Sequence, residues 1–123
     1  MNNGTPRMGT LAVWAGEENP TSGAGTQVPI VRSVAFGYHD VSEWEAVGRG
    51  QATGDIYSRN TNPTVRAFEQ KIQSLENAEA ATSFASGMAA ISNTLSTFLT
   101  PGDRIVSTRD TYGGTNKLFL EFL

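Results

Sequence analysis

Residues 80–91 have the sequence AATSFASGMAAI, and this stretch decides the fold class of the chain. Residues 80–84 are a short, uncharged run that predicts a buried β-strand. Residues 87–99 follow at once and predict an α-helix, because their large apolar side chains recur at helical spacing: Met88, Ile91, Leu95 and Leu99. A strand that leads directly into a helix is typical of α/β proteins.

The same alternation continues on both sides of this stretch. Upstream, Asn62 followed by Pro63 predicts a helix start, and the helix should run to about Asn77. Downstream, a turn at residues 101–103 precedes a second expected strand at 104–107 and a third helix that includes residues 118–122. Alternating strands and helices of these lengths predict a mostly parallel sheet with helical crossovers. Two strands cannot cover three amphipathic helices, so we expect a truncated chain.

Residues 1–56 have a different character. They are rich in Gly, Pro, Thr and Ser, and their apolar runs are too short to close a core, so we expect an arm. One short helix is predicted at residues 41–47, where Asp40 can cap the first N–H groups and Gly48 can end the helix.

The composition excludes several functions. Of the 123 residues, 38% are hydrophobic and 17% charged, as in ordinary globular proteins, and the net charge of −3 gives no footprint for nucleic acid or an acidic membrane. With no cysteine and a single histidine, we expect neither disulfides nor a metal site. No window approaches the roughly 20 apolar residues of a membrane span, and no signal-peptide pattern begins the sequence. We therefore expect a cytoplasmic protein.

Ser86, Gly87 and Met88 stand where the expected strand becomes a helix. The first N–H groups of a helix lack carbonyl partners and point outward with the positive end of the dipole, so this turn can bind an anion. Gly87 has no Cβ and lets a phosphate oxygen approach the backbone. Taken alone, the turn is equally an ordinary strand-to-helix connection capped by a serine.

Tyr57 and Arg59 lie two residues apart, so in an extended segment both side chains project to one face. A guanidinium holds a phosphate bidentately and a phenol adds a charge-assisted hydrogen bond. The alternative is a surface arginine beside a half-buried tyrosine. Tyr112 precedes Gly113 and Gly114, where a turn can lay its ring over a planar ligand. Together the three blocks point to an anionic aromatic cofactor, pyridoxal 5′-phosphate.

These motifs resemble the Cys/Met-metabolism pyridoxal phosphate enzymes. That family includes cystathionine γ-synthase, cystathionine γ-lyase, methionine γ-lyase and O-acetylhomoserine sulfhydrylase. The resemblance begins at residues 10–16, where the family usually has histidine at the position of Trp14. It continues in order through residues 57–64, 75–81, 85–91, 101–103 and 110–115.

The resemblance implies the N-terminal part of the fold-type I pyridoxal phosphate-dependent transferase fold. Residues 1–56 would be an extended arm that contacts a neighbouring subunit. Residues 57–123 would begin the cofactor-binding α/β domain, with the start of a mostly parallel sheet and its crossover helices. A homotetramer built as a dimer of dimers, with shared active sites, is the expected assembly.

Site roles follow from the same resemblance. Tyr57 and Arg59 would bind the cofactor phosphate of the adjacent subunit, and the backbone N–H groups of Gly87 and Met88 that of their own. Tyr112 would stack on the pyridine ring and act in catalysis by assisting proton transfers.

The implied activity is γ-elimination or γ-replacement on a small γ-substituted amino acid, such as a homoserine ester or cystathionine, in trans-sulfuration and methionine and cysteine metabolism. Methionine γ-lyases usually carry cysteine where this chain has Gly114, which favours a synthase, sulfhydrylase or cystathionine-type enzyme. The family's Schiff-base lysine has no counterpart here, so we expect the 123-residue segment alone to be inactive. A methionine γ-lyase-type enzyme and a non-catalytic fragment that binds cofactor or oligomerises remain alternatives.

Overall fold

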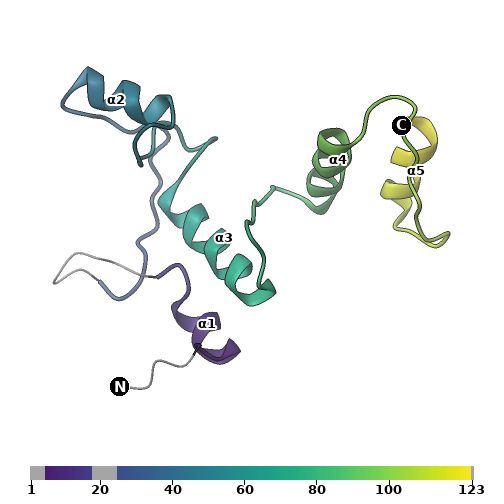
Figure 1. Ribbon diagram of the computed structural model, residues 1–123, viewed down its shortest axis with the longest axis horizontal. Helices are drawn as coiled ribbons and strands as arrows, with labels where there is room; N and C mark the ends of the chain where they lie inside the picture. Colours follow the sequence, from purple (N-terminus) through teal and green to yellow (C-terminus); the bar gives the residue numbers. More distant parts are fainter. Residues whose placement is uncertain (1–4, 18–24, 123) are drawn as a thin grey trace. The chain divides into compact units, whose positions relative to one another are not determined.

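The computed structural model describes residues 5–17 and 25–122, and five α-helices follow one another in that part of the chain (Figure 1). Their bounds are α1 Met8–Trp14, α2 Val41–Gly48, α3 Pro63–Glu76, α4 Gly87–Phe98 and α5 Gly113–Glu121. The chain divides into two compact units, Met1–Thr82 with α1 to α3 and Ser83–Leu123 with α4 and α5. No helix in the described part is long and apolar enough to cross a membrane.

The predicted caps that begin α2 and α3 are confirmed, whereas Gly48, predicted to end α2, is its last helical residue and Arg49 is the C-cap. Asp40 caps α2 by accepting the N–H of Ser42 at 2.8 Å, and Asn62 caps α3 by accepting the N–H of Thr64 at 2.9 Å. Pro63 occupies the first turn of α3, where its missing N–H costs nothing. Asn77 ends α3 in the left-handed conformation, with φ of 51°. These signals are local, which explains why the sequence predicted them.

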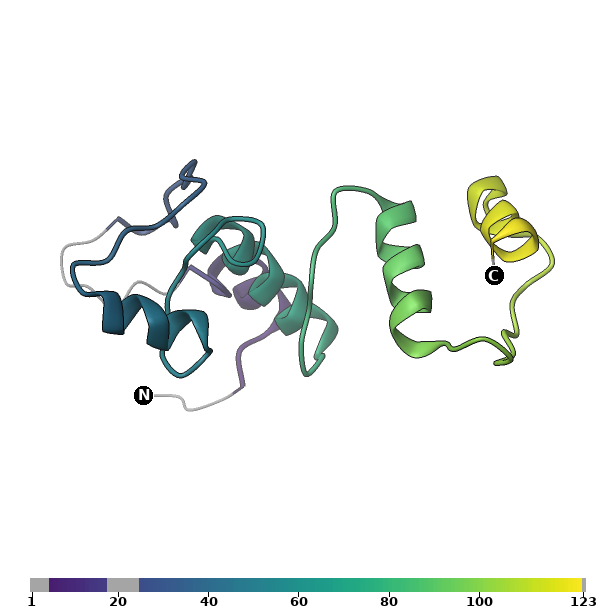
Figure 2. The same ribbon diagram turned by 90° about the horizontal axis from the view of Figure 1, so that it is seen from above.

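Helix α1, Met8–Trp14, was missing from the sequence-based prediction. It has no side-chain N-cap, and its stability comes from α3, against which it packs (Figure 2). Gly16, just past the helix, lies so close to α3 that an added Cβ would sit 2.3 Å from the carbonyl oxygen of Ala67. The contact therefore depends on a residue without a side chain.

Glu17 and Lys71 form a polar clasp that attaches the N-terminal segment to α3. The Nζ atom of Lys71 lies 2.8 Å from one carboxylate oxygen of Glu17 and 3.2 Å from the carbonyl oxygen of Val13. The other carboxylate oxygen of Glu17 accepts the N–H of Val28 at 2.9 Å. These hydrogen bonds, first from Lys71 and then from Val28, hold the pKa of Glu17 below its ordinary value of 4.5.

We expect acid to open this clasp. A carboxyl whose pKa is depressed by folding stabilises the fold above its unfolded pKa and loses that effect as pH falls through the folded value. Below about pH 4.5, the protection of the α1 amides, corrected for the pH dependence of intrinsic exchange, should therefore fall. Glu17→Gln should abolish this pH dependence, whereas Glu45→Gln should preserve it, because Glu45 pairs only with Arg49 on an exposed helix face. If the protection of the α1 amides, so corrected, is the same at about pH 6 and at about pH 3, the assignment is wrong.

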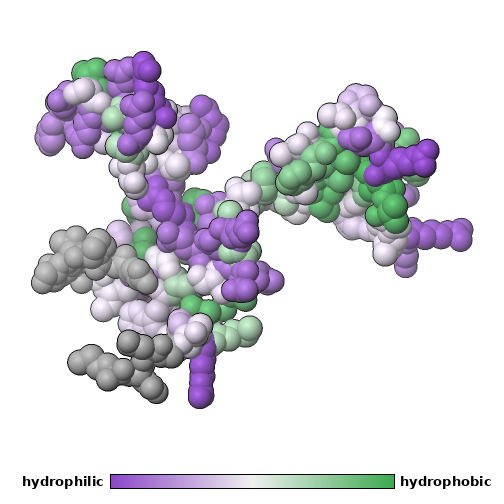
Figure 3. Space-filling model, viewed as in Figure 1, coloured by the Kyte–Doolittle hydropathy of each residue, from purple (hydrophilic) through white to green (hydrophobic). Residues whose placement is uncertain are grey.

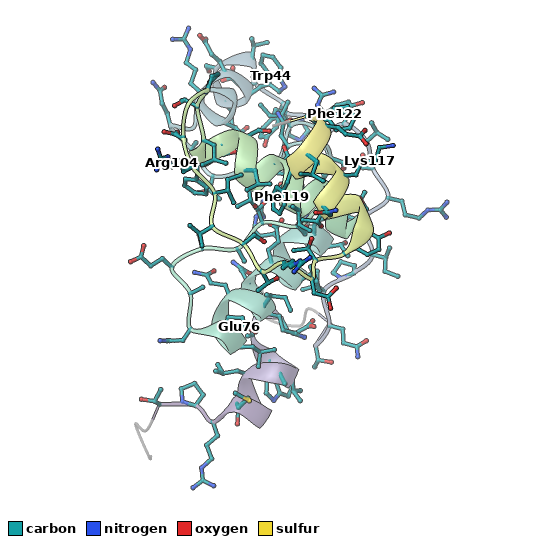
Figure 4. All side chains as sticks on the ribbon, turned by 90° about the vertical axis from the view of Figure 1, so that its right-hand side faces the viewer. Trp44, Glu76, Arg104, Lys117, Phe119 and Phe122 are labelled. Atoms are coloured by element: carbon teal, nitrogen blue, oxygen red, sulfur yellow. The ribbon has the colours of Figure 1, made fainter. Side chains whose placement is uncertain are left out.

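In the second unit, α4 and α5 pack against each other. Leu95 of α4 and its C-cap residue Leu99 line an open pocket together with Phe119 of α5. Figure 4 shows Phe119 on the side of α5 toward α4, with Lys117 on another side. Hydrophobic residues gather on the surface of this unit (Figure 3). The expected turn is present at residues 100–103, where a carboxylate oxygen of Asp103 accepts the N–H of Thr100 at 2.7 Å.

The two predicted strands are not formed. Residues 80–84 and 104–107 lack ladder hydrogen bonds, and within the described residues the only β-pairing is a single antiparallel bridge between Ala35 and Tyr57. Their large side chains are open to solvent: Val106 is 98% exposed and Phe84 39%. A strand is stable only when neighbouring strands satisfy its N–H and C=O groups, and neither segment has such a neighbour here.

No hydrophobic side chain in the described part of the chain is buried. The arm was predicted to form no hydrophobic core of its own, and the described helices have no buried hydrophobic side chain either. Residues 29–36 are nevertheless anchored within the chain, because they hydrogen-bond to residues 56–64. The predicted division at residue 56, with an arm on a neighbouring subunit, concerns an assembly and stays a prediction.

Candidate functional site

The side chains of Tyr57 and Arg59, which precede α3 in the sequence, are in contact. The Cζ atom of Arg59 lies 4.7 Å from the centroid of the Tyr57 ring, within the range of a cation–π contact. Both side chains are exposed. Among the residues that the structure describes, no carboxylate pairs with Arg59, so its guanidinium edge is available to an anion.

The backbone brings these side chains together differently from the predicted extended segment. Tyr57 pairs with Ala35, but the chain turns immediately afterwards, because the carbonyl oxygen of Tyr57 accepts the N–H groups of Asn60 at 2.9 Å and Thr61 at 3.1 Å. Arg59 therefore reaches the tyrosine ring around a tight turn. The predicted proximity holds, while the strand alternation used to derive it was wrong at Arg59.

The N-terminus of α4 has the geometry expected of an anion-binding turn. Ser86 is the N-cap, and its hydroxyl accepts the N–H of Ala89 at 3.1 Å. The N–H groups of Gly87 and Met88 precede that bond and point out of the helix end, as the first N–H groups of any helix do. A Cβ added to Gly87 would contact nothing within 4 Å, and the first turn contains no acidic residue. A phosphate thus has room and meets no repelling carboxylate.

Tyr112 is the residue just before α5, and it is 74% exposed. The start of α5 packs against the start of α4: an added Cβ on Gly114 would lie 2.9 Å from a Tyr112 ring carbon and 3.1 Å from the sulfur of Met88. Buried Thr115 also contacts that sulfur, with its hydroxyl 3.8 Å away. Met88 and Tyr112 are therefore neighbours, and an exposed ring stands beside the open helix end.

The arrangement fits the chemistry of pyridoxal phosphate. The helix end offers backbone donors to the phosphate, and the Tyr112 ring offers a flat face to a pyridine. No group of three or more histidine, cysteine or acidic side chains that could hold a metal ion occurs among the described residues. Sequence reasoning singled out Tyr57, Arg59, Gly87, Met88 and Tyr112, and cofactor binding by these residues stays a prediction.

Sequence reasoning missed the supporting residues. Thr115 and Gly114 join the two helix starts, and their signal was the small-residue run after Tyr112. Asn62 was predicted only as a helix cap, yet it is buried and makes two further hydrogen bonds. Both roles depend on contacts between segments distant in sequence, which no local pattern reveals.

Comparison with known proteins gives a consistent result. The family model described as Cys/Met metabolism PLP-dependent enzyme matches residues 9–123. O-succinylhomoserine sulfhydrylase from Pseudomonas aeruginosa is 37% identical over 110 residues, covering 89% of this chain and 27% of the relative. Cystathionine gamma-synthase from Haemophilus influenzae is 38% identical over 109 residues, covering 89% and 27%. L-methionine gamma-lyase from Pseudomonas putida is 35% identical over 114 residues, covering 93% and 29%.

Solved structures agree. The crystal structure of metB from Corynebacterium glutamicum matches with a TM-score of 0.80 and 34% identity, covering 94% of this chain and 28% of that one. The cystathionine gamma-lyase CalE6 from Micromonospora echinospora matches with a TM-score of 0.78 and 32% identity, over the same shares. This chain spans about a quarter of the length of the curated relatives it matches. With a family model matched over nearly all its residues, the chain belongs to the Cys/Met metabolism pyridoxal phosphate-dependent enzyme family.

Proposed function

We propose that this chain contributes cofactor-binding residues to an enzyme that uses pyridoxal phosphate for γ-elimination or γ-replacement on a γ-substituted amino acid. A homoserine ester or cystathionine fits this chemistry. The relatives named as sulfhydrylases and as a cystathionine gamma-synthase support this choice of substrates.

One observation carries the proposal: the open N-terminus of α4 and the exposed Tyr112 ring lie side by side, joined through Met88 and Gly114. A phosphate anchor and an aromatic platform next to each other suit a ligand that has both a phosphate and a planar ring. Either feature alone would be ordinary, since helix ends and exposed tyrosines are common.

The cofactor, when bound, supplies an electron sink that stabilises the negative charge left when a proton leaves the substrate. The residues of this chain would hold it in place. The N–H groups of Gly87 and Met88 would bind the phosphate, and the Tyr112 ring would stack on the pyridine while its hydroxyl would hold or pass a proton. Tyr57 and Arg59 of an adjacent subunit complete the phosphate site.

Position 114 bears on the choice within the family. A Cβ there would lie 2.9 Å from the Tyr112 ring and 3.1 Å from the sulfur of Met88, so a cysteine side chain would not fit without a shift. Methionine γ-lyases usually have cysteine at this place. The atoms in the way belong to movable side chains, so the glycine at this position, rather than the tight contact, supports a synthase, sulfhydrylase or cystathionine-type enzyme over a methionine γ-lyase.

Neither lysine of this chain is a suitable anchor for the cofactor. Lys71 is held in the clasp with Glu17 at 2.8 Å, and Lys117 lies 3.7 Å from Glu121 on α5. We infer that the anchoring lysine lies in a longer polypeptide that contains this chain, and that the 123 residues alone do not catalyse. A dimer of dimers with shared active sites, located in the cytoplasm, is part of the same proposal.

The test uses the longest natural polypeptide that contains this chain, purified and reconstituted with pyridoxal phosphate. We expect a visible absorption band from bound cofactor and turnover of O-acetylhomoserine, O-succinylhomoserine or cystathionine, with sulfide accelerating replacement on the homoserine esters. Methionine serves as the discriminating substrate for the alternative lyase. Failure to retain any cofactor would overturn the proposal, and cofactor retention without turnover would leave only a binding role.

A further inference from the structure

Asn62 is buried, with 6% of its surface exposed, and it uses both ends of its amide. Its oxygen accepts the N–H of Thr64 at 2.9 Å and so caps α3. Its nitrogen donates to the carbonyl oxygen of Val31 at 3.1 Å and to the hydroxyl oxygen of Ser58 at 3.0 Å. Capping needs only the oxygen, so the two bonds from the nitrogen need a separate explanation.

Ser58 is the residue between Tyr57 and Arg59, and it is fixed at three points. Its N–H donates to the carbonyl oxygen of Val34 at 2.8 Å, and its hydroxyl donates to the carbonyl oxygen of Ser33. A hydroxyl has one proton, so the bond from Asn62 fills an acceptor site on Ser58 that is otherwise open. The turn that carries Tyr57 and Arg59 is therefore held by hydrogen bonds at its central residue, Ser58.

Thr64 holds Val31, whose carbonyl oxygen accepts the second hydrogen bond from the Asn62 nitrogen. Its hydroxyl accepts the N–H of Val31 at 2.8 Å and donates to the carbonyl oxygen of Pro29 at 2.9 Å. The extended segment at residues 29–34, to which Ser58 is bonded, is thus attached directly to the first turn of α3. We refer to Ser58, Asn62 and Thr64 as the Asn62 clamp.

We propose that Asn62 is a positioning residue that holds Tyr57 and Arg59 ready for the cofactor phosphate. The proposal rests on the proposed function, in which that pair binds the phosphate. A guanidinium already fixed near its bound position loses less conformational freedom on binding, so affinity rises without a new contact. Without the nitrogen bonds, the turn after Tyr57 should relax while α3 stays capped.

Two substitutions separate positioning from capping. Asn62→Asp keeps the capping oxygen and the size of the side chain but replaces the donating nitrogen by an acceptor. Ser58→Ala removes the acceptor of the same bond and adds no charge, which controls for repulsion between a new carboxylate and a phosphate. Asp40→Asn makes the reverse exchange at the exposed cap of α2 and serves as the matched control.

The experiment measures the Kd for pyridoxal phosphate and amide hydrogen exchange in the cofactor-free longest natural polypeptide. Both test variants should raise the Kd about 3- to 10-fold and speed exchange at Ser58 and Asn60, with kcat at saturating cofactor unchanged. Exchange at Arg66, whose N–H bonds the Asn62 carbonyl at 2.8 Å, should stay as in the parent in the Asn62→Asp protein. Asp40→Asn should change none of these readouts.

The outcomes distinguish this inference from the function on which it rests. A parent polypeptide that binds no cofactor overturns the proposed function, and exchange at Ser58 and Asn60 then decides whether Asn62 holds the turn. A parent that binds cofactor, with both variants matching its Kd and its exchange at those two residues, reduces Asn62 to a helix cap and overturns the inference.

Discussion

Arg59→Lys is expected to weaken cofactor retention about 10- to 100-fold in the longest natural polypeptide, although the positive charge is kept. The planar guanidinium of Arg59 lies 4.7 Å from the Tyr57 ring and can grip two phosphate oxygens at once. An ammonium cannot make the forked grip. The loss of one hydrogen bond to a charged group costs about 1.5–3 kcal/mol, which corresponds to this change in Kd. Equilibrium titration with pyridoxal phosphate measures it.

The control for this prediction is Arg49→Lys. Arg49 is the exposed C-cap residue of α2 and pairs with Glu45 at 2.6 Å, so replacing its guanidinium by an ammonium should leave the Kd unchanged. If Arg59→Lys binds the cofactor as tightly as the parent and the control do, Arg59 does not belong to the phosphate site.

Gly16→Ala is expected to detach α1 from α3. Gly16 has a φ of +77°, where any Cβ is strained, and the added carbon would stand 2.3 Å from the carbonyl oxygen of Ala67. The obstacle is backbone inside a helix and cannot rotate aside. Left-handed strain of about 1–2 kcal/mol and overpacking of about 1–3 kcal/mol together exceed what a short uncapped helix can offset. Hydrogen exchange across residues 8–17 and the thermal midpoint report the loss.

Gly9→Ala is the matched control, because it adds the same methyl group within α1 itself. A Cβ on Gly9 meets nothing within 4 Å, and alanine in a helix is favoured over glycine by roughly 0.5–1 kcal/mol. Exchange in α1 should therefore slow or stay constant. Equal behaviour of the two variants would show that the contact between Gly16 and Ala67 does not hold α1 in place.

Features that depend on neighbouring residues were predictable from the sequence. Asp40 and Asn62 as caps and Pro63 in a first turn act on N–H groups within a few residues, and the end of α3 near Asn77 was predicted too, although its left-handed conformation was not. The three helices predicted from 41, 62 and 87 onward appear within one or two residues of the expected bounds. The family followed from the order of the motifs, and the comparisons agree.

Features that depend on distant partners could not be predicted in this way. The expected strands at 80–84 and 104–107 have the residues of buried strands, but a sheet requires pairing between segments far apart in sequence. Conversely, α1 lacks a cap and is held by Gly16, Glu17 and their contacts on α3. Strand and helix propensity each failed where a non-local contact decided the outcome.

The sequence by itself determined the family and where most helices begin and end, and it singled out the candidate cofactor-binding residues, because these features depend on residue type and short spacing. The tertiary structure decided how those residues are held. It brought Arg59 over Tyr57 around a turn, set Tyr112 beside Met88 through Gly114, and gave Asn62 a place between three segments. The first of these is a local turn, whereas the other two depend on contacts between distant segments, as from Asn62 to Val31 with a separation of 31, and no local pattern encodes them.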